Sequence, residues 1–133
     1  MKNWTLTNSD PLHLTLAADS RLAAPDYLND HIWEVKLKDG APPALGVQTT
    51  FGLRARVMRL FPRYYRHDQW ISDPDQFYAA PEVIRFFPNY LFVKYAPFSG
   101  VDVLSEFWVP SSQVLAGRIT FTNPSVLREN FQF

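Results

Sequence analysis

The stretch VDVLSEFWVPSSQVLAGRITFTN, residues 101–123, decides the fold because it predicts a long β-hairpin. Pro110 and the two serines that follow it provide a turn between the strands. The second strand alternates, with an apolar face formed by Leu115, Gly117, Ile119 and Phe121 and a more polar face formed by Ala116, Arg118, Thr120 and Thr122. Only ten residues follow the hairpin, and they end on Phe131, Gln132 and Phe133. We therefore expect the chain to be the N-terminal part of a longer, multi-domain protein.

The composition of the 133 residues predicts one all-β domain. Hydrophobic residues make up 47% and charged residues 20%, which excludes a disordered chain. Aromatic residues reach 16%, and there are eleven prolines. Aromatic side chains favour half-buried sheet surfaces, whereas proline is excluded from central strands and is common in loops. We expect residues 1–133 to form a single β-sandwich domain with stiff connections.

The charge and the cysteine content of the chain restrict which partners it can bind and which cellular compartment it is expected to occupy. The 13 basic and 13 acidic residues cancel, so the chain lacks the basic surface that nucleic acid or an anionic membrane would require. No cysteine is present, which excludes disulfides and thiolate metal sites and is compatible with a reducing compartment. The first residues do not resemble a secretion signal, and no apolar stretch is long enough to cross a bilayer. We expect a cytoplasmic protein that binds neither nucleic acid nor membrane.

Other segments with alternating or continuous apolar character predict the remaining strands. They are residues 12–16, 31–38, 45–51, 54–61, 83–87 and 90–96, and we expect the last of these to be covered on both faces. Strands at this spacing, joined by Pro, Gly and Ser turns, indicate antiparallel sheets packed as a sandwich of the supersandwich type. A closed or partly closed β-barrel is the alternative, because strand count does not separate the two. We expect little helix, at most a short turn around residues 20–28 or 73–78.

The densest group of chemically useful side chains lies in residues 63–81, which we expect to form a long loop. Flat rings beside carboxylates suit a sugar, because a pyranose offers a C–H face for stacking and hydroxyls for hydrogen bonds. The candidate carbohydrate-binding residues are Tyr64, Tyr65, Trp70, Asp73, Phe77 and Tyr78. The simpler interpretation, which we favour, is that these aromatic residues anchor the loop to the sandwich.

No catalytic or metal-binding arrangement is recognisable in the sequence. Asp73 and Asp75 flank one proline, and turn formation explains them better than an acid–base pair, whose carboxylates lie across a scissile bond. The three histidines are widely spaced, so we expect neither a metal nor a cofactor. Glu106 and Trp108 share the less apolar face of the first hairpin strand. We expect that face to meet another domain or subunit, with a contribution of Glu106 to a groove as the alternative.

The hairpin also resembles a pattern at the front of multi-domain bacterial glycoside hydrolases of the glycogen-debranching and glucoamylase-like group. In that group a strand ending near (Tyr/Phe)-x-Val-Pro is followed by a short turn and a strand of the type Arg-(Ile/Leu/Val)-Thr-(Ile/Leu/Phe)-x-Asn. The matching residues here are Phe107, Val109, Pro110, Arg118, Ile119, Thr120, Phe121 and Asn123. The stretches NDHIWEVKL and GVQTTFGLRARVMRLFPR are similar to the opening sheet of this group. The resemblance covers residues 12–123 and implies an accessory β-sandwich that packs on a downstream helical catalytic barrel.

Because that barrel holds the catalytic carboxylates of the group, the resemblance assigns no catalytic residue to this chain. It implies a non-catalytic N-terminal accessory domain of a glycoside hydrolase. The implied partners are the downstream catalytic domain and a polysaccharide such as an α-glucan. Two alternatives stay open: an autonomous carbohydrate-binding module, and a protein-interaction domain that forms a homodimer through exposed strand edges and the Glu106/Trp108 face.

Overall fold

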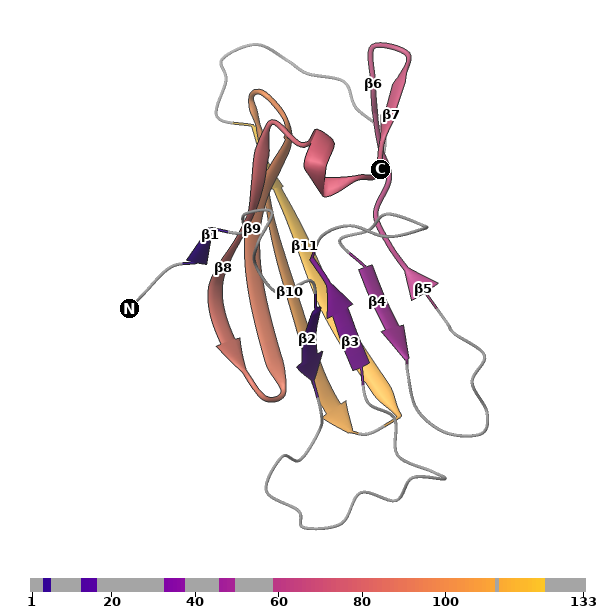
Figure 1. Cartoon of the computed structure of the whole chain (residues 1–133), viewed down its shortest axis with the longest axis vertical. Coiled ribbons are helices and arrows are strands. Elements are labelled where there is room, and N and C mark those ends of the chain that lie inside the picture. The colour runs from indigo at the N-terminus through magenta and orange to yellow at the C-terminus, as the bar shows by residue number, and fades with distance from the viewer. Residues whose placement is uncertain are drawn as a thin grey trace.

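The hairpin over residues 101–123 is present in the computed structural model of the chain, which describes residues 4–5, 13–16, 33–37, 46–49, 59–111 and 113–123. Its strands are β10 (Val101–Ser111) and β11 (Val114–Thr122), which run side by side in Figure 1 and pair antiparallel. The apolar face of β11 packs against the core through Leu115, Ile119 and Phe121. The opposite face of β11 is exposed at Arg118, Thr120 and Thr122. The alternation predicted for this strand is confirmed.

The hairpin belongs to a five-stranded antiparallel sheet with the strand order β1-β8-β9-β10-β11. The other members are β1 (Trp4–Thr5), β8 (Ala79–Phe87) and β9 (Tyr90–Phe98). Short turns at residues 88–89 and 99–100 join β8 to β9 and β9 to β10. The second of these turns uses Gly100 at φ 81°, a backbone conformation that glycine adopts without a steric cost. Consecutive strands from β8 to β11 are therefore neighbours in the sheet.

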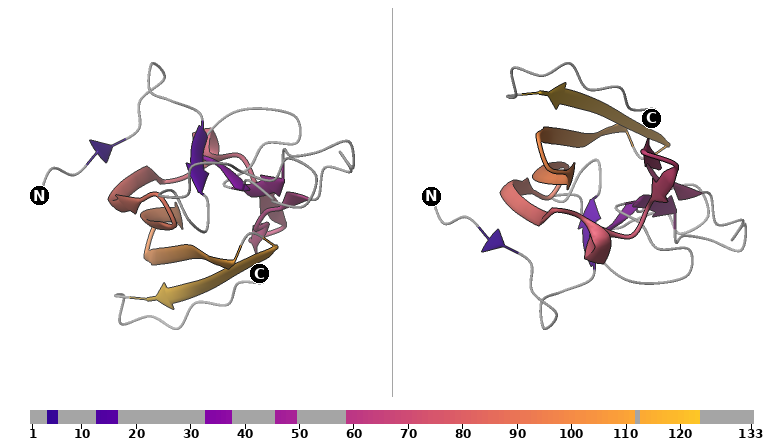
Figure 2. Two further views of the ribbon diagram at one scale, coloured as in Figure 1. Left: turned by 90° about the horizontal axis from the view of Figure 1, so that it is seen from below. Right: turned by 90° about the horizontal axis from the view of Figure 1, so that it is seen from above.

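A second, four-stranded antiparallel sheet has the order β2-β3-β4-β5. Its strands are β2 (His13–Leu16), β3 (Trp33–Lys36), β4 (Gly46–Thr49) and β5 (Arg59–Leu60), each inside a predicted strand segment. Seen end-on in Figure 2, β2–β4 lie on one side of the curved five-stranded sheet. Both strand orders have two open ends among the described residues. The all-β, sandwich-like architecture is confirmed, and no described sheet closes into a barrel.

One apolar core lies between the two sheets. The four-stranded sheet and the residue after β3 contribute Leu16, Trp33, Val35 and Leu37. The five-stranded sheet contributes Val83, Leu91, Val93, Tyr95, Val101, Val103 and Val109. The expectation that residues 90–96 are covered on both faces is wrong, because Lys94 is exposed and Tyr90 and Phe92 are only half-buried. The second sheet packs on one face of β9, which leaves the other face as an outer surface.

The long loop expected over residues 63–81 is instead a small hairpin followed by one helical turn. The hairpin consists of β6 (Tyr64–Arg66) and β7 (Gln69–Ile71), which form a separate two-stranded sheet. Its turn residues, His67 and Asp68, have φ values of 49° and 60°. Such turns usually carry Asn-Gly or Asp-Gly, so His-Asp gave no recognisable hairpin signal.

The helical turn is η1 (Pro74–Gln76), a short 3-10 helix. The carboxylate of Asp73 accepts a hydrogen bond from the backbone N–H of Asp75 at 3.0 Å, which caps the turn. The short turn predicted around residues 73–78 is confirmed, as is the turn-forming role of Asp73; residues 20–28 lie outside the described part of the chain. In the part that the structure describes, no helix is long and apolar enough to span a membrane.

A chain of buried hydroxyl groups ties the β6–β7 hairpin to the five-stranded sheet. The Tyr64 and Tyr95 hydroxyls lie 2.6 Å apart, and the Tyr95 hydroxyl lies 3.0 Å from the Ser105 Oγ. All three residues are buried, and burial raises the pKa of both tyrosines, which keeps their hydroxyls protonated. The ring of Phe77 stacks on that of Tyr95, with centroids 5.3 Å apart. This cluster fixes the position of residues 64–77 against the sandwich.

Candidate functional site

The outer face of the five-stranded sheet carries the two residues that the sequence predicted to lie at an interface. Along β10, Val101, Val103, Ser105 and Val109 point into the core, with exposures of 0–1%. The alternate positions, which include Glu106 and Trp108, lie on the other face and are half-buried or exposed. The predicted sharing of a less apolar face by Glu106 and Trp108 is therefore confirmed.

Three aromatic residues on neighbouring strands lie in one row across this outer face. The strand register places Phe87 of β8 opposite Tyr90 of β9, and Tyr90 opposite Trp108 of β10. Phe87 is 49% exposed, Trp108 is 37% exposed and Tyr90 is half-buried. The ring centroids of Phe87 and Tyr90 are 6.3 Å apart. We refer to Phe87, Tyr90 and Trp108 as the aromatic row.

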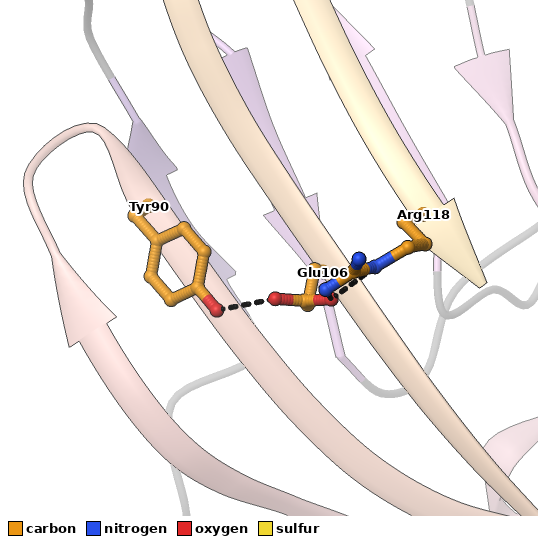
Figure 3. Close-up of polar contacts among 3 residues, drawn as sticks. All are labelled: Tyr90, Glu106 and Arg118. Atoms are coloured by element: carbon orange, nitrogen blue, oxygen red, sulfur yellow. Dashed lines mark hydrogen bonds and ion pairs between the residues drawn. The ribbon is translucent and has the colours of Figure 1, made fainter. Parts of the chain in front are cut away.

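A polar network lies beside the aromatic row, centred on Glu106 (Figure 3). The Tyr90 hydroxyl donates to one carboxylate oxygen of Glu106 at 2.8 Å. The other oxygen accepts from Arg118 Nε at 2.7 Å and also forms an ion pair with Arg118 Nη2. This two-point contact between a guanidinium and a carboxylate fixes the orientation of both groups. Arg118 pairs directly opposite Glu106 in the β10–β11 register, so the backbone brings the two side chains together.

The network sets the protonation states of its members. The hydrogen bonds from Tyr90 and Arg118 lower the pKa of Glu106, so its carboxylate is ionised at neutral pH. Partial burial and the bond to Glu106 raise the pKa of Tyr90, which keeps that hydroxyl protonated. An ionised carboxylate with both oxygens engaged cannot serve as a general acid. Glu106 can instead orient the Arg118 side chain, which is 68% exposed.

The network predicts a pH-dependent contribution to stability. Because the pKa of Glu106 is lowered in the folded state, its stabilisation is present above the ordinary value of 4.5 and is lost as the pH falls through the folded-state value. We expect Glu106→Gln to lower the melting temperature slightly at pH 7, since exposed ion pairs contribute less than about 1 kcal/mol. Calorimetry should show the difference from the original protein shrinking below pH 4.5. A constant difference from pH 7 to pH 3 would contradict this assignment.

The candidate sugar-binding residues of the 63–81 segment do not form one surface. Tyr64 is fully buried and Phe77 is only 9% exposed, so neither can stack on a sugar; both are core residues, and their inclusion in a surface site was wrong. Asp73 caps η1. For Tyr64 the physical reason is the β6–β7 pairing, which turns alternate side chains of one short hairpin to opposite sides. Phe77 follows η1, and its ring packs on those of Tyr64 and Tyr95. The interpretation of these aromatics as anchors is confirmed for Tyr64 and Phe77.

The remaining candidates, Tyr65, Trp70 and Tyr78, stay at the surface. Tyr65 and Trp70 face each other across the hairpin, with ring centroids 4.9 Å apart. The Arg63 guanidinium lies over the Trp70 ring, 4.7 Å from its centroid, and the Tyr65 hydroxyl donates to Asp68 at 2.6 Å. The Trp70 ring is thus already engaged by groups of its own hairpin. Tyr78 is 71% exposed.

Sequence reasoning missed Phe87, Tyr90 and Arg118 as members of the site. Phe87 and Tyr90 flank the Pro88-Asn89 turn, which offered a hint that their rings meet across a hairpin. Arg118 was placed on the correct face of its strand. Its pairing with Glu106 depends on the register of the hairpin. A shift of the strand pairing by two residues would keep the same apolar face, so the alternation alone does not fix that register.

Comparison with protein-family models, with curated proteins and with solved structures gives no match to this chain.

Proposed function

We propose that the chain is a non-catalytic accessory domain of a glycoside hydrolase of the glycogen-debranching and glucoamylase-like group. In this role it supports a downstream catalytic domain and contacts polysaccharide through its outer sheet face. The class of enzyme comes from the resemblance of the hairpin to that group, and the all-β sandwich agrees with it. The proposed location is the cytoplasm, which the absence of cysteine permits.

The observation that carries the proposal is the state of Glu106 beside the exposed aromatic row. Retaining and inverting glycosidases need one carboxylic acid that stays protonated until it donates its proton. Glu106 is held ionised by Tyr90 and Arg118. Elsewhere Asp102 pairs with Lys94 at 3.4 Å, and Asp73 caps a helical turn. These carboxylates have structural partners, while Phe87 and Trp108 beside Glu106 are exposed.

The hydrolytic inactivity of the chain is directly testable. We expect the purified 133-residue protein to release no glucose from maltooligosaccharides or glycogen above a buffer blank, measured by a coupled glucose assay. The Glu106→Gln variant serves as the control for trace contamination, because a contaminating enzyme would be unaffected by it. Glucose release that disappears in Glu106→Gln would overturn the proposal. A catalytic domain with a helical barrel, encoded in the same reading frame, would support it.

A protein-interaction or dimerisation domain is the second candidate, and one observation favours it. Four exposed large apolar side chains gather at the end of the five-stranded sheet where the β8–β9 and β10–β11 turns lie. They are Phe86, Phe87, Trp108 and Val114, each 37–49% exposed; Phe86 lies on the core-side face of the sheet, and Phe87 and Trp108 lie on its outer face. Exposed apolar groups that cluster on a surface often mark contacts between proteins. Sedimentation velocity at several concentrations distinguishes this candidate, because it requires self-association or a bound partner protein.

A further inference from the structure

We propose that the aromatic row and Arg118 together form a binding platform for a neutral pyranose chain, of which an α-glucan is the first candidate. The choice of an α-glucan rests on the proposed function. The platform itself rests on the geometry of the outer sheet face. It differs from the segment of residues 63–81 that the sequence suggested for sugar binding.

The apolar part of the platform has the right form for a chain of sugars. Phe87, Tyr90 and Trp108 occupy one register row on three adjacent strands. Neighbouring strands are about 4.8 Å apart, so the row extends over roughly 10 Å, which is longer than one monosaccharide. Pyranose rings present C–H groups that pack on aromatic faces, and the indole of Trp108 offers the largest such face. The Phe87 and Tyr90 rings are inclined to each other by 44°, so a chain that crosses the strands would meet them as separate stacking faces.

The polar part of the platform is positioned before any ligand arrives. Glu106 uses one oxygen for Tyr90 and the other for Arg118, which holds the guanidinium in place beside the row. Arg118 is 68% exposed, and a guanidinium has five N–H groups, so donors remain for sugar hydroxyls. A side chain that is already ordered loses less conformational entropy when it binds. Fixed donors next to apolar rings are the combination that orients a ligand with hydroxyls and C–H faces.

The charges on this face argue for a neutral ligand. Glu106 is compensated by Arg118, and Lys94 by Asp102. The register adds Glu82 and Arg85 to this face, so its described residues carry three charges of each sign. A surface with balanced pairs gives a polyanion no net attraction. The Glu106–Arg118 ion pair lies directly next to the aromatic row, with Arg118 68% exposed. A neutral polysaccharide can use that pair as a hydrogen-bonding group without removing it fully from water.

Affinity electrophoresis tests the proposal with the whole 133-residue chain. We expect amylose or glycogen in a native gel to retard the protein, and Trp108→Ala to weaken the apparent affinity by about tenfold or more, as for a central aromatic contact. Arg118→Ala should also weaken binding, by a smaller factor. Trp70→Ala is the matched control, because Trp70 is 49% exposed but lies on β7, outside the platform. This control should bind like the original protein.

Each other outcome has a defined meaning. Circular dichroism and the melting temperature show whether Trp108→Ala folds. If this variant does not fold, the binding measured for Arg118→Ala, which alters an exposed side chain, is used in its place. Loss of binding in Trp70→Ala with retention in Trp108→Ala would overturn the platform in favour of the β6–β7 hairpin. The platform proposal would be overturned altogether if amylose, glycogen and other neutral polysaccharides failed to retard the protein. Self-association that Trp108→Ala abolishes would also overturn it. The non-catalytic assignment is tested separately, by hydrolysis, so its failure and the failure of the platform are distinguishable.

Discussion

Replacing Leu91 by alanine is expected to lower the free energy of unfolding by about 3 kcal/mol. Leu91 is fully buried on β9, the middle strand of the five-stranded sheet, between Phe86 of β8 and Phe107 of β10. The substitution removes most of an apolar side chain and leaves a cavity that strands bonded on both sides cannot close. Urea unfolding followed by circular dichroism measures the loss as a lower midpoint with an unchanged slope.

Phe87→Ala is the matched control for that measurement. Phe87 lies on the neighbouring strand β8 but is 49% exposed, so its truncation creates no cavity. We expect its cost to stay below about 1 kcal/mol. If the two variants lost similar amounts of stability, the assignment of Leu91 to a tightly packed core between the sheets would be wrong.

Tyr95→Phe is expected to have the next largest effect, a loss of about 2 kcal/mol in the free energy of unfolding. The Tyr95 hydroxyl is the middle member of the buried chain, 2.6 Å from the Tyr64 hydroxyl and 3.0 Å from the Ser105 Oγ. Its removal deprives both neighbours of this partner in a dry environment, where water cannot replace it. Thermal unfolding gives the size of the effect. The same measurement on Tyr64→Phe shows whether the two hydroxyls act as a unit.

Tyr65→Phe tests whether burial causes the Tyr95 effect. Tyr65 makes an equally short hydrogen bond, 2.6 Å to Asp68, but at the surface of the β6–β7 hairpin. Water can solvate Asp68 once the phenol hydroxyl is gone, so we expect a change within about 0.5 kcal/mol. A cost equal to that of Tyr95→Phe would show that hydrogen-bond length, rather than desolvation, controls these tyrosines.

The Leu91 and Tyr95 variants also concern the outer face, because the residues of the core and those of the outer face alternate along the same strands. On β9 and β10, alternate residues belong either to the core or to the outer face that carries the platform, and the two sets share one backbone. Leu91 lies on the core face between Tyr90 and Phe92 of the outer face. Core packing therefore holds the aromatic row in register, and a weakened core is expected to loosen the platform as well.

The strands of the C-terminal hairpin were predictable because the pattern that indicates a strand lies within that strand's own sequence. A residue pattern of period two follows directly from the pleat of a strand, and one apolar face then indicates one sheet packed on a core. Hence the faces of β10 and β11, the sandwich class and the turn around Pro74 all agree with the predictions. The β6–β7 hairpin was not predictable in the same way, because its His67-Asp68 turn adopts positive φ values without the usual glycine.

The sequence by itself determined which residues of β10 and β11 face the core, since that depends only on alternation along one strand; it did not do so for β9, whose residues are apolar on both faces. Only the tertiary structure decided which residues meet across strands, because register and strand order depend on contacts between distant segments. Trp108 thereby joins Phe87 and Tyr90, and Glu106 meets Arg118, whereas Tyr64 and Phe77 turn inward. The candidate site exists because four strands, β8 to β11, align, and no single stretch of the chain encodes that alignment.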